Sequence, residues 1–465
     1  MIPETANPAR IALAGLAGDS GKTLISLGLL LLARESGLAV AAFKKGPDYI
    51  DAAWLRWASG RQARNLDTYL MGFDTCAASF VRHAARDGFN VIEGNRGLFD
   101  GADPEGTHST AELAKALGAP ILLVLNATKV TRTAAAFVLG CQYLDPKLRV
   151  AGVILNRVGT IRQERILREA IENASGVPVL GVLPRVRQEK VLPGRHLGLV
   201  TPAEHPQIAD VEANVKSLVR DNVDFDRILE IARSAPPLPV RPAETPPLPD
   251  GSGLRIGFVT DSAFTFYYPE NLEAVEASGA ELIPVSPLES SGVPADLHAL
   301  YMGGGFPETH GLRLAENRTF LASLREAALA GLPVYAECGG LMLLARAIRW
   351  RGERYEMAGV LPVEVEVTSR PQGHGYTELT VDRPNPFYQE GVRLRGHEFH
   401  YSRIVPGEEM PVTACAVTRG AGCYDFRDGI VVANTFAAYT HVHALATPEW
   451  AAGLIAAARR YAERT

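Results

Sequence analysis

The stretch Gly15-Leu-Ala-Gly-Asp-Ser-Gly-Lys-Thr23 lies between an apolar run that begins at Arg10 and an apolar helix predicted from Leu24. A glycine-rich turn in this position exposes successive backbone amides at a helix N-terminus, where they can bind phosphate groups. The usual pattern GxxxxGK[ST] would place its first glycine at position 16, where the chain has Leu16, so only Gly21-Lys-Thr23 matches in full. We therefore interpret the stretch as an irregular P-loop for ATP rather than as an ordinary strand–helix turn. The predicted nucleotide-binding residues are Gly18, Ser20, Gly21, Lys22 and Thr23.

The first half of the chain alternates short apolar runs with amphipathic stretches. Strands are predicted at residues 10–17, 38–45, 89–94, 120–127, 150–156 and 177–184, and helices at 24–36 and 109–117. Strands that alternate with helices form βαβ units, so we expect a mostly parallel sheet.

Polar clusters follow two more of these strands. Phe43-Lys-Lys-Gly-Pro-Asp-Tyr-Ile-Asp51 ends the second predicted strand, and Glu93-Gly-Asn-Arg-Gly-Leu-Phe-Asp100 ends the third. The carboxyl ends of parallel strands are where open α/β sheets bind ligands. Carboxylates there suit Mg²⁺, and Arg96 suits a carboxylate of a substrate. Each charge taken alone is more typical of a solvated surface, but three clusters at consecutive strand ends predict one site.

A proline-rich segment divides the chain into two halves of similar length. Seven prolines lie between positions 236 and 249, followed by Asp250-Gly-Ser-Gly253. Proline has a fixed φ and no amide donor, so the segment is typical of a linker. Strands predicted at 254–260, 281–284, 299–303 and 333–336 repeat the α/β pattern, and strands at 364–367 and 376–381 follow. We predict two α/β domains, 1–234 and 254–465, joined by a linker at 235–253.

Cys338 lies in Val334-Tyr-Ala-Glu-Cys-Gly-Gly-Leu-Met342, which runs from an apolar strand into an apolar helix. A cysteine at such a turn resembles a nucleophile elbow, where the next amide can stabilise an oxyanion and the helix N-terminus favours the thiolate. Tyr301-Met-Gly-Gly-Gly305 offers further amides, and Tyr439-Thr-His441-Val-His443 offers a base. The alternative is a buried inert thiol, which is the interpretation we give to the other four cysteines.

Composition excludes several classes of protein. The 465 residues are 47% hydrophobic and 21% charged with a formal net charge of −5, which supports packed cores and argues against disorder and general nucleic-acid binding. Length alone suggests about two to four domains. The apolar runs are shorter than the roughly 18 residues of a membrane span, and the N-terminus lacks a signal-peptide pattern, so we expect a cytoplasmic protein. The five scattered cysteines match no disulfide framework and no zinc motif.

Together these motifs resemble the cobyrinate a,c-diamide synthase family, close to the cobyric acid and dethiobiotin synthetase-like ATPases. The resemblance covers nearly the whole chain and implies an α/β protein with two parts. These are an N-terminal P-loop domain of the dethiobiotin synthetase type and a C-terminal class I glutamine amidotransferase domain. The resemblance rests on residues 20–23, 45–51, 93–94, 97–101, 261–268, 271–272, 303–308, 337–340, 395–402 and 439–441.

The resemblance implies a role for each motif. Cys338, activated by His441, would attack the amide of glutamine and release ammonia. Many class I amidotransferases carry a glutamate two residues after this histidine, where the chain has His443, so the third member of the site stays open. ATP, a co-substrate used with Mg²⁺, would phosphorylate a substrate carboxylate, and ammonia would displace the phosphate to give an amide. The implied residues are Gly304, Gly305 and Gly339 for the oxyanion and glutamine; Thr23, Asp51 and Glu93 for the metal; Lys44, Lys45, Tyr49 and Arg96 for the substrate; and Asn156 for adenine.

The implied substrate is a tetrapyrrole polycarboxylate, amidated on its a- and c-acetate groups, with cobyrinate ranked first. Asn95-Arg96 stands where family members usually have an apolar pair, so sirohaem and nickel-sirohydrochlorin are alternatives for the same chemistry. Because ammonia protonates in water, the two sites are expected to face each other, and a homodimer is compatible with the resemblance.

Two other classes compete with this interpretation. A P-loop ATPase switch of the chromosome-partitioning kind would leave Cys338 and His441 without a role. A dethiobiotin-type carboxylase with a non-catalytic C-terminal module would release no glutamate from glutamine, so a glutaminase assay separates the hypotheses.

Overall fold

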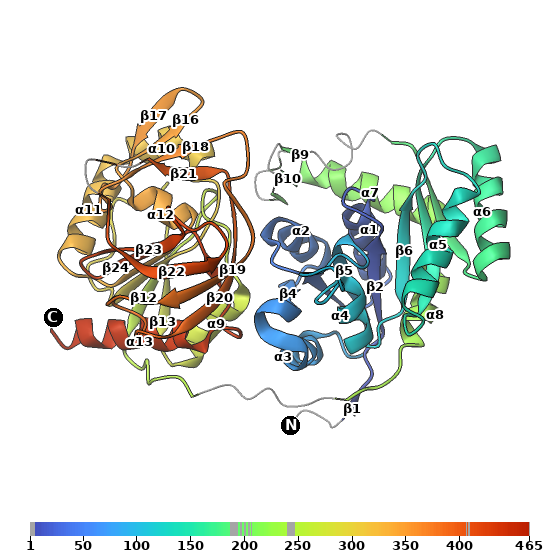
Figure 1. Cartoon of the computed structure of the whole chain (residues 1–465), viewed down its shortest axis with the longest axis horizontal. Coiled ribbons are helices and arrows are strands. Elements are labelled where there is room, and N and C mark those ends of the chain that lie inside the picture. The colour runs from blue at the N-terminus through green and yellow to red at the C-terminus, as the bar shows by residue number, and fades with distance from the viewer. Residues whose placement is uncertain are drawn as a thin grey trace. The chain divides into compact units, whose positions relative to one another are not determined.

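The computed structural model describes residues 5–186, 194–195, 198–199, 201–202, 205, 207–239, 247–405, 407 and 410–464. They form two compact units, Met1–Ala243 and Glu244–Thr465 (Figure 1). The division falls inside the predicted linker 235–253, of which residues 240–246 lie outside the described residues. One part of that linker is a short strand, because β11 (Leu238–Pro239) pairs antiparallel with β1 (Thr5–Ala6). The exact limits of the two predicted domains stay a prediction.

The first unit is built on a parallel sheet of seven strands, in the order β4-β3-β5-β2-β6-β7-β8. All six predicted strands form. β4 was not predicted, since its three residues show no apolar pattern. The strands are β2 (Arg10–Gly15), β3 (Val40–Lys45), β4 (Arg64–Leu66), β5 (Phe89–Gly97), β6 (Ile121–Asn126), β7 (Val150–Val158) and β8 (Val179–Pro184).

Helix α1 (Lys22–Glu35) holds the loop after β2, because it is buried along most of its length. It packs against α2 and α7, and Gly28 permits the close approach to α7, since a Cβ atom there would lie 2.2 Å from Cγ2 of Val219. The other helices of this unit are α2 (Tyr49–Ser59), α3 (Thr68–His83), α4 (Thr110–Ala116), α5 (Thr133–Leu144), α6 (Ile161–Ser175), α7 (Ile208–Asn222) and α8 (Phe225–Arg233). A two-stranded ladder joins β9 (Gly194–Arg195) and β10 (Gly198–Leu199).

The second unit contains a ten-stranded mixed sheet in the order β13-β12-β14-β15-β24-β23-β22-β19-β20-β25. Its first five strands are parallel and the rest pair antiparallel. The strands are β12 (Arg255–Val259), β13 (Glu281–Val285), β14 (Ala299–Met302), β15 (Val334–Glu337), β19 (Gly373–Val381), β20 (Arg393–His400), β22 (Thr413–Arg419), β23 (Arg427–Val432), β24 (Thr435–Ala438) and β25 (His441–Val442).

Among the described residues, a smaller four-stranded sheet and six helical segments complete this unit. The small sheet has the order β17-β16-β18-β21. Its strands are β16 (Ala347–Trp350), β17 (Glu353–Glu356), β18 (Glu364–Val367) and β21 (Ser402–Val405). The helical segments are α9 (Pro269–Ala277), the 3₁₀ helix η3 (Pro307–His310), α10 (Gly311–Glu316), α11 (Arg318–Leu329), α12 (Gly339–Leu344) and α13 (Pro448–Ala462).

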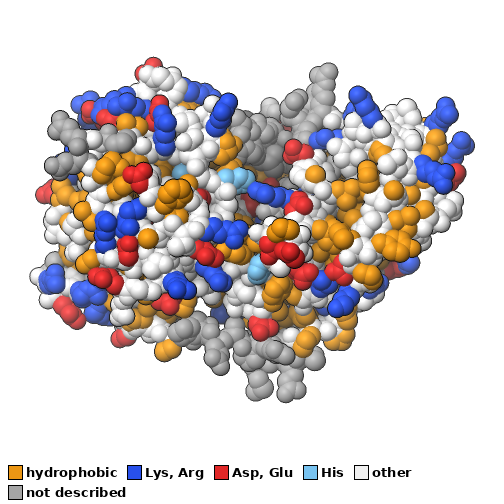
Figure 2. All heavy atoms as spheres, viewed as in Figure 1, with side chains coloured by type: hydrophobic (Ala, Val, Ile, Leu, Met, Phe, Trp, Pro, Cys, Tyr) orange, Lys and Arg blue, Asp and Glu red, His pale blue; other side chains and the backbone are white. Residues whose placement is uncertain are grey.

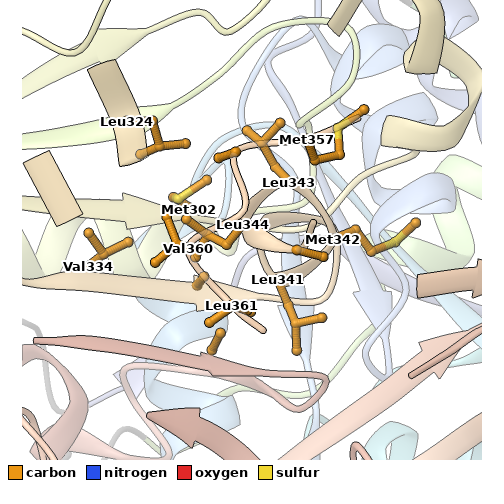
Figure 3. Close-up of a cluster of buried hydrophobic side chains, with 14 of the residues drawn as sticks. Met302, Leu324, Val334, Leu341, Met342, Leu343, Leu344, Met357, Val360 and Leu361 are labelled. Atoms are coloured by element: carbon orange, nitrogen blue, oxygen red, sulfur yellow. The ribbon is translucent and has the colours of Figure 1, made fainter. Parts of the chain in front are cut away.

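Helix α12 is embedded in the core of the second unit. Leu341, Met342, Leu343 and Leu344 lie among Met302, Val360, Leu361 and other apolar side chains (Figure 3). Close packing on several sides gives the turn before α12 a rigid support.

The described helices include none that is both long and apolar enough to cross a membrane. On the visible faces, basic and acidic side chains are interspersed rather than separated by sign (Figure 2).

Candidate active sites

The loop between β2 and α1 is exposed from Leu16 to Asp19 and ends at Gly21, whose φ of 98° is left-handed. A Cβ atom at Gly15 would lie 2.3 Å from Oγ of Ser20. Gly15 therefore leaves the space that Ser20 needs when the loop turns back over the end of β2.

Lys22 reaches back over this loop. Its Nζ donates to the carbonyl oxygens of Ala17, at 3.1 Å, and Arg96, at 2.9 Å, and lies 3.4 Å from Oγ of Ser20. Burial, and then the nearby charge of Lys44, lower the pKa of Lys22. A buried ammonium that is held only by carbonyl and hydroxyl oxygens is well placed to bind an anion.

Asn156, at the end of β7, supports the same loop. Its Nδ2 donates to the carbonyl oxygen of Ser20 at 2.9 Å, and a Cβ atom at Gly21 would lie 2.1 Å from that nitrogen. Around Gly18 the space is open, since a Cβ atom there would meet nothing within 4 Å. The structure thus brings the predicted loop residues together, and the adenine contact of Asn156 stays a prediction.

A buried cluster of charges lies beneath the loop, at the ends of β3 and β5. Lys44 Nζ contacts Oδ2 of Asp51 at 2.5 Å and Oε1 of Glu93 at 2.8 Å, and the Thr23 hydroxyl donates to the same Oε1 at 3.0 Å. Lys44 is only 1% exposed. In this arrangement Lys44 holds the two carboxylates in place, and its predicted contact with the substrate stays a prediction.

The charges of this cluster stabilise one another. Burial by itself favours the neutral amine, but Asp51 and Glu93 raise the pKa of Lys44. Burial by itself raises the pKa of Asp51, yet the charge and hydrogen bond of Lys44 outweigh it and lower that pKa. For Glu93 burial dominates, and its pKa is raised although Lys44 opposes the shift.

The cluster fits a phosphate-bound Mg²⁺. Oε2 of Glu93 is buried without a hydrogen-bond partner, and the Thr23 hydroxyl and the Asp51 carboxylate lie around the same lysine–glutamate pair. The described residues include no group of three or more His, Cys, Asp and Glu side chains that could hold a metal alone. Mg²⁺ commonly takes one or two carboxylates and completes its shell with phosphates and water, so this donor set is suitable.

The other predicted substrate residues lie beside the cluster. Arg96 is exposed and has a positive φ of 47°. Lys45 is 5% exposed, and burial lowers its pKa, with Asp67 opposing the shift. Tyr49 is the half-buried first residue of α2. Of the four residues predicted to face the substrate, Arg96 is thus the one with an exposed cationic side chain.

In the second unit, Cys338 sits at the turn between β15 and α12. Its φ of 45° and ψ of −95° are strained for a residue with a side chain, and such strain is concentrated at functional sites. Its amide donates to the carbonyl oxygen of Ala438 on β24 at 2.8 Å. The predicted sharp turn is therefore present, and it is hydrogen-bonded to Ala438, three residues before His441 in the sequence.

His441 is paired with the residue next to Cys338. Its Nδ1 lies 3.1 Å from Oε2 of Glu337, and the other carboxylate oxygen accepts from the Val442 amide at 3.3 Å. Tyr301 also donates its hydroxyl to Oε2, at 3.2 Å. A proton on Nδ1 for Glu337 leaves Nε2 as the basic nitrogen. Sequence reasoning missed Glu337, although its position beside Cys338 in the quoted motif was a signal.

The glycine loop after β14 lies against both catalytic candidates. A Cβ atom at Gly304 would lie 2.6 Å from Cε1 of His441, and one at Gly339 would lie 2.9 Å from the Gly305 nitrogen. The Gly304 amide already donates to the carbonyl oxygen of Phe266 at 3.2 Å. Gly304 thus leaves room for the imidazole, and its predicted place in the oxyanion and glutamine site stays a prediction.

The resting thiol is not activated by its surroundings. Burial, followed by the charges of Glu308 and Glu337, raises the pKa of Cys338, although the Gly339 amide opposes the shift. The sequence-based expectation that the helix N-terminus favours the thiolate is wrong here, because burial and then the charges of Glu308 and Glu337 outweigh the effect of a helix of six residues on the pKa of Cys338. Attack by this thiol requires a base.

His443 belongs to a separate buried group. Its Nδ1 accepts from the Leu445 amide at 3.2 Å, and its Nε2 lies 3.5 Å from Oε2 of Glu270. Its ring packs against Tyr268, whose hydroxyl contacts Nδ1 of His397 at 3.1 Å. His397 in turn stacks on His441, with ring centroids 5.0 Å apart. His443 therefore supports His441 indirectly, through Tyr268 and His397, and does not take the place of the usual glutamate.

These two sites define a glutamine-hydrolysing carbon–nitrogen ligase with a nucleotide-binding domain. Residues 255–449 match the CobB/CobQ-like glutamine amidotransferase domain, and residues 11–199 match the CobQ/CobB/MinD/ParA nucleotide binding domain.

More specifically, the chain belongs to the cobyrinate a,c-diamide synthase family. It is 42% identical to the cobyrinate a,c-diamide synthase of Magnetococcus marinus, over 95% of each chain. The same comparison gives 39% identity with that of Dehalococcoides mccartyi, over 96% of this chain and 97% of the relative. The synthase of Archaeoglobus fulgidus is 39% identical over 94% of each chain. The predicted fold, with a P-loop domain and an amidotransferase domain, is confirmed.

Proposed function

We propose that this protein amidates the a- and c-acetate carboxylates of cobyrinate, with ATP as co-substrate and glutamine as the nitrogen source. The observation that carries the proposal is the identity of 42%, over 95% of the chain, with a cobyrinate a,c-diamide synthase. The two sites described above supply groups for each half of the reaction.

In the first unit, the proposal assigns ATP to the loop that contains Lys22. A free carboxylate is a poor acyl donor, because its leaving group would be an oxide. Transfer of a phosphoryl group from ATP converts it into an acyl phosphate, whose leaving group is phosphate. Lys22 would hold the phosphates while Thr23, Asp51 and Glu93 hold Mg²⁺, which would neutralise charge on them. Ammonia would then attack the acyl phosphate, form the carbon–nitrogen bond and expel phosphate.

In the second unit, the proposal assigns glutamine hydrolysis to Cys338. Nε2 of His441 would take the thiol proton as sulfur attacks the side-chain amide carbon. The amides of Gly339 and Gly305 would stabilise the oxyanion. The resulting imidazolium would return the proton to the departing nitrogen, so that ammonia leaves and a thioester remains for hydrolysis.

Glu337 acts as a positioning residue in this scheme. Glu337→Gln is expected to lower kcat for glutamine hydrolysis about 10²-fold with little change in KM, because an amide can no longer fix the tautomer and charge of His441. Steady-state glutamate release between pH 6 and 9 measures this, and the acidic limb of the profile should move. As the matched control, Glu366→Gln changes a half-buried residue of β18 that pairs with Arg403, and it should leave the rate unaltered. Unchanged kcat in Glu337→Gln would exclude the assignment.

The macrocycle is the part of the proposal that a product assay tests. Cobyrinate, sirohaem and nickel-sirohydrochlorin are offered in parallel with ATP, Mg²⁺ and glutamine, and products are weighed by mass spectrometry. We expect cobyrinate to lose 2 Da in two steps of about 1 Da, the difference between a carboxylic acid and a primary amide. Preferred turnover of either other macrocycle would overturn the choice of cobyrinate, and exposed Arg96 is the residue to test next in that case.

A further inference from the structure

Asp428 is a fully buried carboxylate on β23 that the mechanism above does not use. Its Oδ1 accepts hydrogen bonds from the Gly429 amide at 2.9 Å, the Tyr439 amide at 3.0 Å and the thiol of Cys423 at 3.0 Å. Its Oδ2 accepts from the Thr440 amide at 3.0 Å. Burial of a carboxylate is costly unless hydrogen bonds compensate it, and here three amides and a thiol do so.

Two of these amides belong to the two-residue link 439–440 between β24 and β25. The backbone ladder between β23 and β24 ends at the pair of Ile430 and Ala437. His441 then begins β25, which pairs with β20 rather than with β23. Beyond the end of the ladder, the carboxylate of Asp428 therefore takes the place of a strand partner for the link.

This link leads the chain from the nucleophile to the base. Just before the link, the carbonyl oxygen of Ala438 accepts from the Cys338 amide at 2.8 Å. Just after the link, Nδ1 of His441 lies 3.1 Å from Oε2 of Glu337. Residues at the end of β15 thus hold both ends of the link, and Asp428 holds the two peptides between them.

We propose that Asp428 is a positioning residue that sets the place of the His441 imidazole by holding the two peptides before it. The inference rests on the proposed glutaminase function and adds a residue that acts through the base. The imidazole is closely packed on one side, since a Cβ atom at Gly304 would lie 2.6 Å from its Cε1. Displacement of a catalytic group by about 1 Å can cost on the order of 10²-fold in rate.

Asp428→Asn tests this role because it changes one contact at nearly constant size. The asparagine oxygen can still accept the three bonds of Oδ1, but its NH₂ group would face the Thr440 amide, donor against donor. We expect kcat for glutamine hydrolysis to fall on the order of 10²-fold with little change in KM, because the base acts in the chemical step. Steady-state glutamate release measures both constants.

The direction of the change separates the position of the base from the charge of Asp428. Burial is the main cause of the raised pKa of Cys338, and the charge of Asp428 adds to it. Loss of that charge would by itself favour the thiolate and so its attack. A lower kcat in Asp428→Asn would therefore not come from the lost charge.

A double-mutant cycle with Glu337→Gln separates positioning from a general loss of packing. If both side chains act by placing His441, the double variant should be about as slow as the slower single variant, because the base is already displaced. Multiplication of the two factors would mean that Asp428 acts independently of the base and would overturn the inference. Asp382→Asn is the matched control, because it changes an exposed partner of Arg427, the residue before Asp428, and it should leave kcat unchanged.

Asp428→Ser is a second variant, which is smaller and cannot overpack the core, and it should show the same split between kcat and KM. A normal kcat in either folded variant would overturn the inference. If neither variant shows a cooperative thermal unfolding transition while Asp382→Asn does, Asp428 serves the core alone and the inference is overturned as well. A wild-type protein that releases no glutamate from glutamine would instead overturn the proposed function, and this role of Asp428 with it.

Discussion

Replacing Cys338 by alanine is expected to abolish glutamine-dependent amidation while ammonia-dependent amidation continues. The loss of glutaminase activity should reach at least about 10⁴-fold, because no other group in the site can form the thioester. Free ammonium chloride at alkaline pH bypasses the second unit, so the same variant should still form product from ATP and the macrocycle. Glutamate release and product mass, measured on one preparation, check both halves of the prediction.

The control for this variant is Cys415→Ala. Cys415 is also fully buried in the second unit, but it lies on β22 and packs into a different core cluster from Cys338. The Cys415→Ala variant should therefore keep glutamine-dependent activity. Normal glutamate release by Cys338→Ala, or loss of the ammonia-dependent reaction together with it, would contradict the assignment of separate sites.

The same thiol should show its protonation state in its reactivity. Burial and the charges of Glu308, Glu337 and Asp428 raise the pKa of Cys338, and only the Gly339 amide lowers it. A raised pKa keeps the thiol protonated at neutral pH, so alkylation by iodoacetamide should be slow at pH 7 and accelerate up to pH 9. A rate that is already constant below pH 7 would mean that the resting site holds a thiolate.

Much of the fold could be predicted because its strands are continuous apolar runs that end in glycine or charged residues. Each predicted strand of the first unit lies in the parallel sheet, since burial on both faces requires such runs. The short β4 and three strands of the small sheet, β16, β17 and β21, were not predicted, whereas the strand predicted at 364–367 forms as β18. The residues of the small sheet include many arginines and glutamates, such as Arg349, Arg354 and Glu364, which pair across the sheet instead of producing an apolar pattern.

The parts of the site that sequence reasoning missed depend on contacts across the chain. Lys44 follows a strand like its neighbour Lys45, and only the fold shows that Asp51 and Glu93 enclose it. Glu337 reaches His441 from 104 positions away, because β15 and β24 are adjacent parallel strands. Spacing along a motif identifies residues that share a turn, but it contains no information on pairs that the sheet order creates.

Replacing Lys22 by alanine is expected to abolish amidation with either nitrogen source. The side chain of Lys22 is held over the exposed loop by the carbonyl oxygens of Ala17 and Arg96, and it places a positive charge at that loop. Phosphoryl transfer depends on stabilising charge on the phosphates, so its removal should cost at least about 10³-fold in kcat/KM for ATP. Product mass with glutamine and with ammonia, and release of ADP, measure the effect.

Lys22→Ala should remove only one of the two reactions. Glutamine hydrolysis belongs to Cys338 and His441 in the other unit, so Lys22→Ala should still release glutamate even though it forms no amide. Lys147→Ala, an exposed change in the same unit, should leave both reactions intact. If Lys22→Ala still forms the amide at a normal rate, the loop does not bind the phosphates that react. The nucleotide would then have to occupy another part of the first unit, and the cluster of Thr23, Asp51 and Glu93 would lose its proposed role with it.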